Sequence, residues 1–98
     1  MKPYKFHPQA AAEYAEAKAY YSRIRSELGE RFEAEINEVI ESVCRHPQRY
    51  REYDPPLRRH FSQSFPYAIL YHEQPARVWI VAVTHMKRRP GYWKKRLA

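Results

Sequence analysis

Apolar residues recur at spacings of three and four over the first half of the chain. The first stripe contains Ala10, Tyr14, Ala17, Tyr21, Ile24 and Leu28, and the second contains Phe32, Ile36, Val39, Ile40 and Val43. This period predicts two helices, each with one apolar face. Pro8 suits the first residue of a helix, Gly29 interrupts the pattern between the stripes, and Pro47 ends the second helix. Because almost nothing separates the stripes, we expect an antiparallel helical hairpin.

The period changes to about two in the second half. The segments that indicate strands are YKFH (4–7), LRRHFSQ (57–63), FPYAILYHE (65–73) and RVWIVAVTH (77–85). In the third of these, alternation places Tyr67, Ile69 and Tyr71 on one face and Ala68, Leu70 and His72 on the other. The last segment is apolar on both faces, which is typical of a central strand. The proline-rich, charged stretch 46–59 predicts a loop that leads into the second strand.

The predicted order of elements is therefore β-α-α-β-β-β. We expect a three-stranded meander, completed by the N-terminal strand, to pack its apolar face on the helical hairpin. This is an α+β fold of two layers with a small, mainly antiparallel sheet. The 98 residues fit a single domain over 1–98.

Charge is distributed unevenly along the chain. Residues 1–43 contain six Lys or Arg against eight Glu, a balance of −2, whereas residues 44–98 contain twelve Lys or Arg against three acidic residues, a balance of +9. This asymmetry concentrates positive potential on one part of the surface, which suits nucleic acid or an anionic protein. General solubility explains a basic composition equally well.

Several classes of protein find no support in the sequence. Cys44 is the only cysteine, so no internal disulfide can form. The start MKPYKFHPQ has no apolar signal region, and no apolar run is long enough to cross a membrane, so we expect a cytoplasmic protein. The histidines form no metal motif and two glycines cannot build a phosphate loop. We therefore expect no cofactor and no metal. The Glu residues of the second helix are predicted to form a solvated face.

The tail VTHMKRRPGYWKKR (83–96) carries the densest group of basic and aromatic residues. Beside the basic first strand of the meander, such residues can hold phosphates and stack on bases. The expected target-binding residues are Arg58, Arg59, Lys87, Arg88, Arg89, Tyr92 and Trp93.

The same residue types can cleave RNA without a metal. That reaction needs a base for the 2′-hydroxyl, a cation for the phosphorane and an acid for the leaving oxygen. His85 could be the base, Arg59 or Arg88 the cation, and Tyr92 the acid. A purely structural interpretation stays open for each candidate.

His85 can cap its strand by a hydrogen bond to the backbone. Tyr92 and Trp93 can fold back over a core edge. Lys94, Lys95 and Arg96 are expected to form a solvated tail, and Arg58 and Arg59 can protect a sheet edge from strand addition.

The order of elements, the HP after the second helix, the FPYAILY strand and the ending VAVTHMKRRPGYWKKR together resemble the RelE/ParE superfamily of toxins. The tail pattern H-x-x-R-x-P-x-Y-W is the most specific part, and here consists of His85, Arg88, Pro90, Tyr92 and Trp93. These toxins belong to bacterial type II toxin–antitoxin modules, which include plasmid stabilisation systems. The resemblance implies a cognate antitoxin with an acidic, partly disordered C-terminal segment that wraps the toxin.

The superfamily divides by target. Its RelE-like branch cleaves mRNA on the ribosome, and its ParE-like branch poisons DNA gyrase without a known catalytic site. Ala68 stands where the ribonuclease branch usually has an Arg that stabilises the scissile phosphate, and Met86 stands near another position that is often a cation. His85 and Tyr92 match positions kept in some ribonucleases. The resemblance therefore favours a ParE-like gyrase inhibitor. A ribosome-dependent mRNA endonuclease is the alternative, and a non-toxic basic nucleic-acid-binding module is the second.

Overall fold

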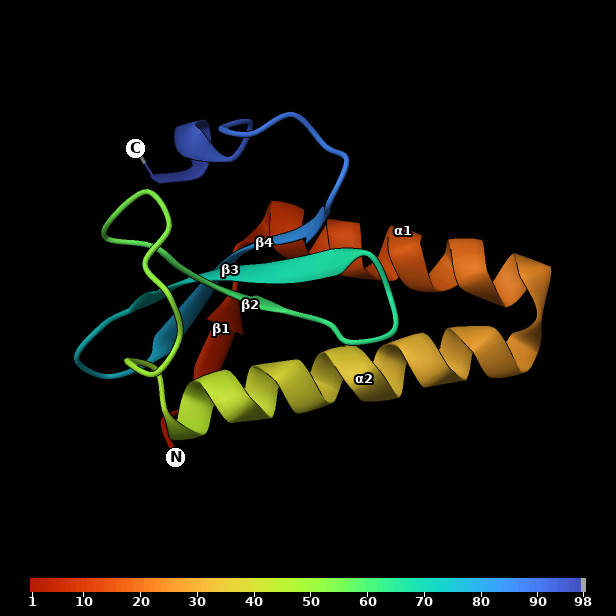
Figure 1. Cartoon of the computed structure of the whole chain (residues 1–98), viewed down its shortest axis with the longest axis horizontal. Coiled ribbons are helices and arrows are strands. Elements are labelled where there is room, and N and C mark those ends of the chain that lie inside the picture. Colours follow the sequence, from red (N-terminus) through yellow and green to blue (C-terminus); the bar gives the residue numbers. More distant parts are fainter. Residues whose placement is uncertain (98) are drawn as a thin grey trace.

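The computed structural model describes residues 1–97 and confirms the predicted order of elements. The helices and strands are β1 (Tyr4–Phe6), α1 (Pro8–Ile24), α2 (Ser26–Arg45), β2 (Arg58–Phe61), β3 (Tyr67–Glu73) and β4 (Val78–His85), followed by the short 3₁₀ helix η1 (Lys94–Leu97). The sheet has the order β1-β4-β3-β2, in which β1 is parallel to β4 and the other pairs are antiparallel. The two helices lie antiparallel along one face of this sheet (Figure 1). The predicted α+β class and the mainly antiparallel sheet are both observed.

The break between the helices lies earlier than the sequence predicts. Arg25 alone has extended backbone, with φ −165° and ψ 134°, so Leu28 and Gly29 belong to the first turns of α2. Gly29 does not end a helix; it lies where α2 approaches α1 closely. A Cβ placed on it would lie only 2.9 Å from the Cβ and 3.1 Å from the Cα of Ser22. The missing side chain allows the ends of α1 and α2 to meet.

The main core fills the space between the helices and the sheet. Its fully buried members include Phe32 and Ile36 from α2 and Ile69 and Ile80 from the central strands. Rings from α1, β3 and the preceding loop surround Phe32 with centroids about 5 Å away, namely Tyr21, Phe65 and Tyr67. The predicted apolar stripes therefore do meet, and their burial is the main stabilising contribution to the fold.

A β-bulge in β4 changes which of its side chains face the helices. Tyr71 of β3 lies opposite Ile80 and Leu70 lies opposite Ala82, which leaves Val81 without a partner. The extra residue reverses the alternation. Ile80 and Val83 face the helices, whereas Val81 and Ala82 face the other side of the sheet.

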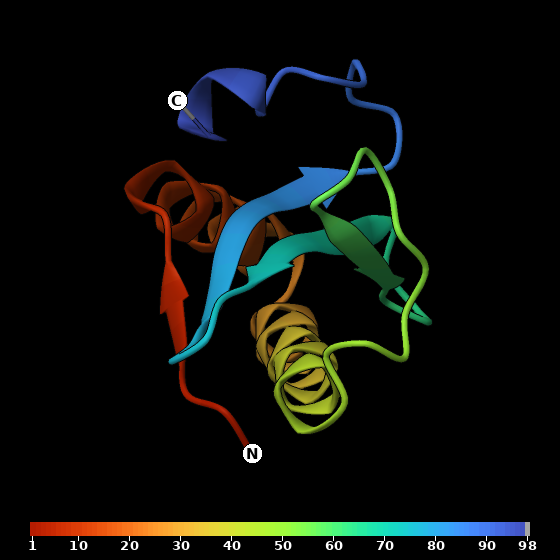
Figure 2. The ribbon, with the colours of Figure 1, turned by 90° about the vertical axis from the view of Figure 1, so that its left-hand side faces the viewer.

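That other side, here called the outer face, carries a second, smaller core. Leu57, Leu70, Val81 and Ala82 are fully buried there beneath Trp93. Figure 2 shows the C-terminal segment (residues 86–97, blue) on the side of the sheet away from α2. The molecule therefore has the two predicted layers and a partial third cover made by this segment and the loop before β2.

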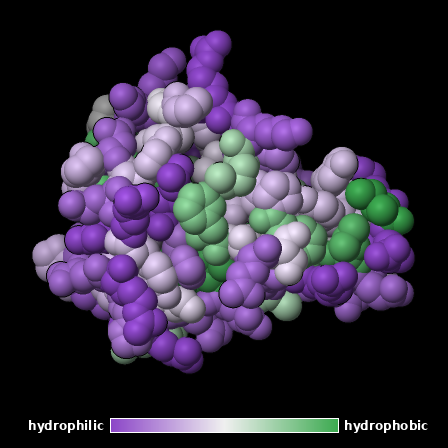
Figure 3. Space-filling model, in the orientation of Figure 1, coloured by the Kyte–Doolittle hydropathy of each residue, from purple (hydrophilic) through white to green (hydrophobic). Residues whose placement is uncertain are grey.

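Within residues 1–97, neither helix is long and apolar enough to cross a membrane. The surface seen in Figure 3 is mostly hydrophilic, with one hydrophobic patch near its centre and another at the end of the helical hairpin.

Candidate target-binding face

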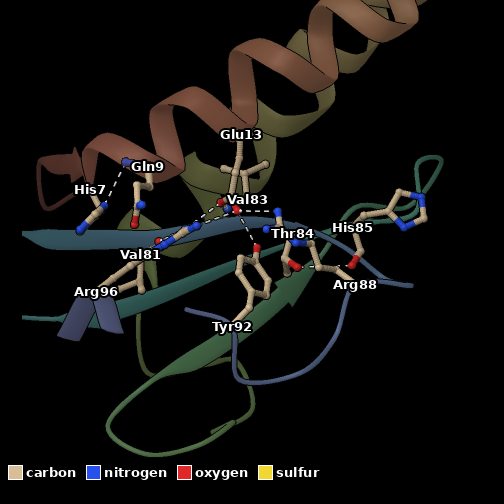
Figure 4. Close-up of polar contacts among 10 residues, drawn as sticks. All are labelled: His7, Gln9, Glu13, Val81, Val83, Thr84, His85, Arg88, Tyr92 and Arg96. Carbon is tan, nitrogen blue, oxygen red and sulfur yellow. Dashed lines mark hydrogen bonds and ion pairs between the residues drawn. The ribbon is translucent and has the colours of Figure 1, made fainter. Parts of the chain in front are cut away.

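The C-terminal segment is fastened to α1 through the carboxylate of Glu13. Its oxygens accept hydrogen bonds from the Tyr92 hydroxyl at 2.7 Å, from two Arg96 nitrogens at 2.9 Å each and from the Val83 backbone N–H at 3.0 Å. Arg88 approaches the same carboxylate at 3.4 Å. Figure 4 shows these side chains converging on Glu13 from β4 and from the tail. We call this group the Glu13 cluster.

The cluster satisfies backbone groups that β1 leaves open. β1 pairs with β4 only as far as Ile80, and the bulge then turns the carbonyl of Val81 and the N–H of Val83 toward the free edge. Arg96 donates to the Val81 carbonyl at 2.9 Å, and Glu13 accepts from Val83. Two charged side chains thus replace a strand at this edge, where unpaired buried backbone groups would otherwise be costly.

Arg96 corrects the prediction of a uniformly solvated tail. Lys94 and Lys95 are exposed as predicted, but the side chain of Arg96 is only 7% exposed. Burial by itself would lower the pKa of Arg96, and the hydrogen bonds and charge of Glu13 outweigh that effect and raise it. The two partners lie 83 positions apart, and the tail KKR gives no sign of which cation turns inward.

Tyr92 and Trp93 both fold back over the molecule. Trp93 is 3% exposed and packs on the outer-face core, edge to face with Tyr92. Burial, together with the neighbouring Glu13 carboxylate, raises the pKa of Tyr92 to about 12. A phenol held in this way is a poor proton donor at neutral pH, so its placement favours the structural interpretation of Tyr92 over a role as general acid.

A cavity of about 80 Å³ on the outer face brings together four of the sequence candidates. Its lining includes Arg59, His85, Arg88 and Trp93, with Ala68 beside them. The other target-binding candidates lie outside this lining. We refer to this space as the outer-face cavity.

Arg58 turns away and donates to the carbonyl of Tyr50 at 2.8 Å. Lys87 and Arg89 are exposed on the C-terminal segment next to the cavity, and Tyr92 is held in the Glu13 cluster. The structure therefore separates the predicted set into cavity residues, exposed flanking cations and two residues held in contacts within the molecule, Arg58 and Tyr92.

Aromatic rings hold the cavity's guanidinium groups in place. The Arg59 guanidinium carbon lies 3.8 Å from the centroid of Tyr53 and 4.7 Å from that of Phe61. Arg88 lies 3.9 Å over the ring of Tyr92. Such stacking fixes the plane of a guanidinium while leaving its N–H groups free to donate.

His85 occupies the end of β4 between two hollows. Its Nδ1 accepts a hydrogen bond from the backbone N–H of Lys87 at 3.0 Å, which is the capping contact that the structural interpretation predicts. Its ring meets Tyr67 edge to face at 5.1 Å. Besides the outer-face cavity, it lines a second cavity of about 230 Å³ between α1 and β4. Since Nδ1 is occupied, Nε2 is the nitrogen available for other contacts.

The same fold is found among known proteins. A family model described as "ParE toxin of type II toxin-antitoxin system, parDE" matches residues 4–90, nearly the whole chain. The chain belongs to the ParE toxin family. The predicted superfamily and its ParE-like branch are thereby confirmed. Tyr92, Trp93 and Arg96 lie beyond the matched residues, although Glu13 and Arg88 lie within them.

A solved structure described as "Chromosomal ParDE TA system from P. aeruginosa" contains a chain similar to this ParE-family member. The TM-score is 0.64 at 16% sequence identity, and the match covers 87% of this chain and 96% of that chain. At this identity the likeness concerns the fold. No curated protein sequence matches the chain.

Several residues around this ParE-family face could not be singled out from the sequence. Glu13 lies within an alanine-rich helical stripe and looks like an ordinary solvated acid. Tyr53 comes from the loop before β2, and only the alternation of Arg59 with Phe61 hinted that these two share a face. In residues 1–97, no three His, Cys, Asp or Glu side chains gather closely enough to hold a metal ion.

Proposed function

We propose that this ParE-family toxin inhibits DNA gyrase by binding it through the outer face, and that a cognate antitoxin with an acidic C-terminal segment neutralises it. The main observation behind the proposal is the outer-face cavity, whose lining includes Arg59 and Arg88. The chain that forms this cavity belongs to the ParE family. A concave, positively charged surface held by stacked arginines suits a binding function without requiring chemistry.

The details of the cavity favour binding over catalysis. Ala68 occupies the cavity lining at a position where the ribonuclease branch usually has an arginine, so one cation for a scissile phosphate is missing. Tyr92, the candidate acid, is tied to Glu13. Loss of a group that stabilises a transition state typically lowers the rate about 10²- to 10³-fold.

A supercoiling assay with purified gyrase tests the proposal. We expect the purified toxin to inhibit supercoiling, and Arg59→Gln and Lys87→Gln to weaken the inhibition. Arg23→Gln, at the exposed end of α1, removes the same charge far from the outer face and should leave inhibition unchanged. Absence of inhibition at high toxin concentration would rule the proposal out.

Neutralisation by an antitoxin has its own test. Lys87, Arg89, Lys94 and Lys95 are exposed and form no ion pair with another part of residues 1–97, so they can attract an acidic segment. Co-expression with the product of the neighbouring gene should restore growth to cells arrested by the toxin. Arrest that persists when both proteins accumulate would contradict this part of the proposal.

One observation keeps a ribosome-dependent mRNA endonuclease as the second candidate. His85, Arg59 and Arg88 do line a single cavity, as a metal-independent nuclease would need. Ribosomes programmed with mRNA should show A-site cleavage that His85→Ala and Arg88→Ala abolish. Intact mRNA in this assay, or cleavage that survives both substitutions, removes the candidate.

A further inference from the structure

The outer-face cavity carries positive charge that the molecule itself does not fully neutralise. Arg59 and Arg88 line it, and none of its lining residues is acidic. Arg59 forms no ion pair within residues 1–97. Glu13 pairs with Arg88 from outside the lining but is shared with Arg96, so two guanidinium groups face one carboxylate. The cavity therefore suits a negatively charged group.

A hydrogen-bond donor in the cavity wall has no acceptor. The indole N–H of Trp93, one of the lining residues, is buried and makes no hydrogen bond with any other described residue. Such a donor is costly and uncommon in native proteins, and it can mark a place where a ligand supplies the acceptor. The donor is closed off in the free protein, so the lining must yield before a ligand oxygen reaches it. Met86 can move aside, because this unbranched side chain lines the cavity and is 48% exposed.

A second hollow, of about 300 Å³, adjoins the cavity. Tyr53, Pro90 and Trp93 belong to both linings, so the two spaces are neighbours. This shared wall of aromatic and proline rings suits an aliphatic side chain. Asp54 and Lys94 also line the adjoining hollow, and their opposite charges leave it without the positive excess of the cavity. Side by side, the two spaces fit a charged acceptor next to an aliphatic group.

We propose that an acidic segment of the antitoxin places one carboxylate in the outer-face cavity and a neighbouring aliphatic side chain in the adjoining hollow. A carboxylate is a planar acceptor with two oxygens, which can accept from the guanidinium of Arg59 and from the Trp93 indole together. The cavity volume of about 80 Å³ leaves room for one small charged group. A segment bound in this way covers the face to which we assign target binding.

The adjoining hollow favours a peptide over a nucleic-acid strand. A strand carries a phosphate at every nucleotide, and one that crossed the hollow would bring a phosphate to the exposed carboxylate of Asp54. A peptide carries charge only where its sequence places it. Trp93 is 3% exposed, so it offers no open ring face on which a base could stack. Beside the two spaces, the exposed cations Lys87 and Arg89 can attract further acidic side chains of the same segment.

The assignment of the cavity rests on the proposed function, because it takes the antitoxin as the partner, but the two can fail separately. Peptide binding can be measured without gyrase. A toxin that binds an acidic–aliphatic peptide in the cavity but spares gyrase would contradict only the proposed target. A toxin that inhibits gyrase but does not bind the peptide would contradict only the role of the cavity.

The first test follows the two indole N–H signals by NMR in the ¹⁵N-labelled full chain. The probe is a short peptide of alternating glutamate and leucine, and the same peptide with glutamine in place of glutamate is its matched control. We expect the acidic peptide to shift the Trp93 signal and the control peptide to leave it in place. Trp79, which packs near His7 and does not line the cavity, gives the reference signal. An unmoved Trp93 signal, or equal shifts with both peptides, would overturn the proposal.

Two further probes separate the sources of negative charge. Acetate supplies a carboxylate without a neighbouring side chain, and a single-stranded thymidine oligonucleotide supplies phosphates. Burial of an aliphatic side chain typically strengthens binding about tenfold or more, so the acidic peptide should act at concentrations about tenfold below those of acetate. If acetate or the oligonucleotide shifts the Trp93 signal at the same concentration as the peptide or a lower one, the cavity does not recognise an acidic–aliphatic segment.

Substitutions locate the binding, followed by fluorescence anisotropy of the labelled acidic peptide. Trp93→Phe keeps a ring over the outer-face core but removes the N–H. A hydrogen bond to a charged group contributes about tenfold in affinity, so binding should weaken by about that factor. Trp79→Phe removes an indole N–H outside the cavity lining and should have no effect. Equal affinities of wild type and Trp93→Phe, or equal losses in the two tryptophan variants, would contradict the proposed acceptor.

Charge is tested in the same assay. Arg59→Gln should weaken binding of the acidic peptide, whereas Arg23→Gln removes the same charge at the exposed end of α1 and should leave binding unchanged. Equal losses in these two variants would reduce the cavity to general charge attraction and overturn the assignment.

The Trp93 signal can also be observed in the natural complex. In labelled toxin co-purified with the product of the neighbouring gene, it should move in the same direction as with the saturating acidic peptide. A complex in which the signal keeps its position in the free toxin would show that the antitoxin leaves the outer-face cavity empty.

Discussion

The carboxylate of Glu13 joins three parts of the molecule that are distant in sequence. It receives N–H and O–H donors from β4 and from the C-terminal segment, and only 10% of its side chain is exposed. Glu13→Ala would leave Arg96 charged and buried without a partner and would also free the Val83 N–H. Breaking a buried ion pair from one side typically costs about 3–5 kcal/mol. We therefore expect the free energy of unfolding, measured in urea, to fall by about that amount.

A control for this prediction lies one turn further along α1. Glu16 is exposed and forms no ion pair within the described residues, so Glu16→Ala should change the free energy of unfolding by less than about 0.5 kcal/mol. Similar losses for the two alanine variants would show that the Glu13 cluster contributes no specific stability.

Gly29 is the second single residue whose substitution has a defined consequence. Alanine in an open helix position would be favoured over glycine by about 1 kcal/mol. Here the added methyl group would press on Ser22, and overpacking of this kind costs about 1–3 kcal/mol. We expect a net loss of about 1 kcal/mol in urea unfolding, partly restored in the double variant that adds Ser22→Gly. A more stable Gly29→Ala protein would contradict the close approach of the helices.

Single residues also mark the limit of what the sequence predicts. The H-x-x-R-x-P-x-Y-W pattern correctly drew attention to His85 and Arg88, which share the outer-face cavity. It could not show that Arg96, rather than Lys94 or Lys95, turns inward, because that choice depends on Glu13 and on an open edge of β4 created by folding. Contacts between residues so far apart leave no periodic trace in one sequence.

Among the elements, β4 shows both the strength and the limit of pattern analysis. Its apolar character on both faces predicts a central strand, and it does lie between β1 and β3. The bulge at Val81 has no sequence signal of its own, since no glycine or proline marks it. The sequence misplaces the break between α1 and α2 for a related reason. A glycine at position 29 predicts a helix break, whereas the role of Gly29 is set by its tertiary contact with Ser22.

The loop between β2 and β3 is anchored on α2 by an acidic side chain, which predicts a pH dependence. Glu35 accepts hydrogen bonds from the Ser62 hydroxyl and from the Ser64 N–H. Burial by itself would raise the pKa of Glu35, but these hydrogen bonds outweigh it and lower the pKa below its ordinary value of 4.5. The charged form is therefore favoured by folding. Its contribution to stability is present above about pH 4.5 and is lost as the pH falls through the lowered pKa.

Carboxyl-carbon NMR titration measures this pKa directly. Ser62→Ala should move the pKa of Glu35 back toward its ordinary value, since the hydroxyl donor is removed. In urea unfolding, the free energy of unfolding of wild type should exceed that of Glu35→Gln at neutral pH, and this difference should disappear at acid pH. A pKa that Ser62→Ala leaves unchanged, or a stability difference independent of pH, would show that the loop is held by other contacts.

At the scale of the whole molecule, the two predicted layers account for the main core but not for the outer face. The tail was expected to contact a target, with the folding back of Tyr92 and Trp93 as the alternative. The structure gives its residues different tasks. Trp93 closes the second core and Arg96 and Tyr92 fasten the segment, while Lys87 and Arg89 remain exposed. A single short segment can thus complete the fold and present the positive surface.

Deleting residues 91–98 tests that dual role. The deletion removes Trp93 from above Leu57, Leu70 and Val81 and leaves Glu13 without Arg96. Loss of a buried tryptophan alone typically costs about 3–5 kcal/mol, and each kcal/mol lowers Tm by roughly 4–8 °C in a domain of this size. We therefore expect Tm, followed by circular dichroism, to fall by at least roughly 12 °C. Deleting only residues 97–98 is the control and should leave Tm nearly unchanged, because Trp93 and Arg96 stay in place. If the chain without residues 91–98 has the same Tm as the full-length protein, the segment does not stabilise the fold. The dual role proposed for it would then be contradicted.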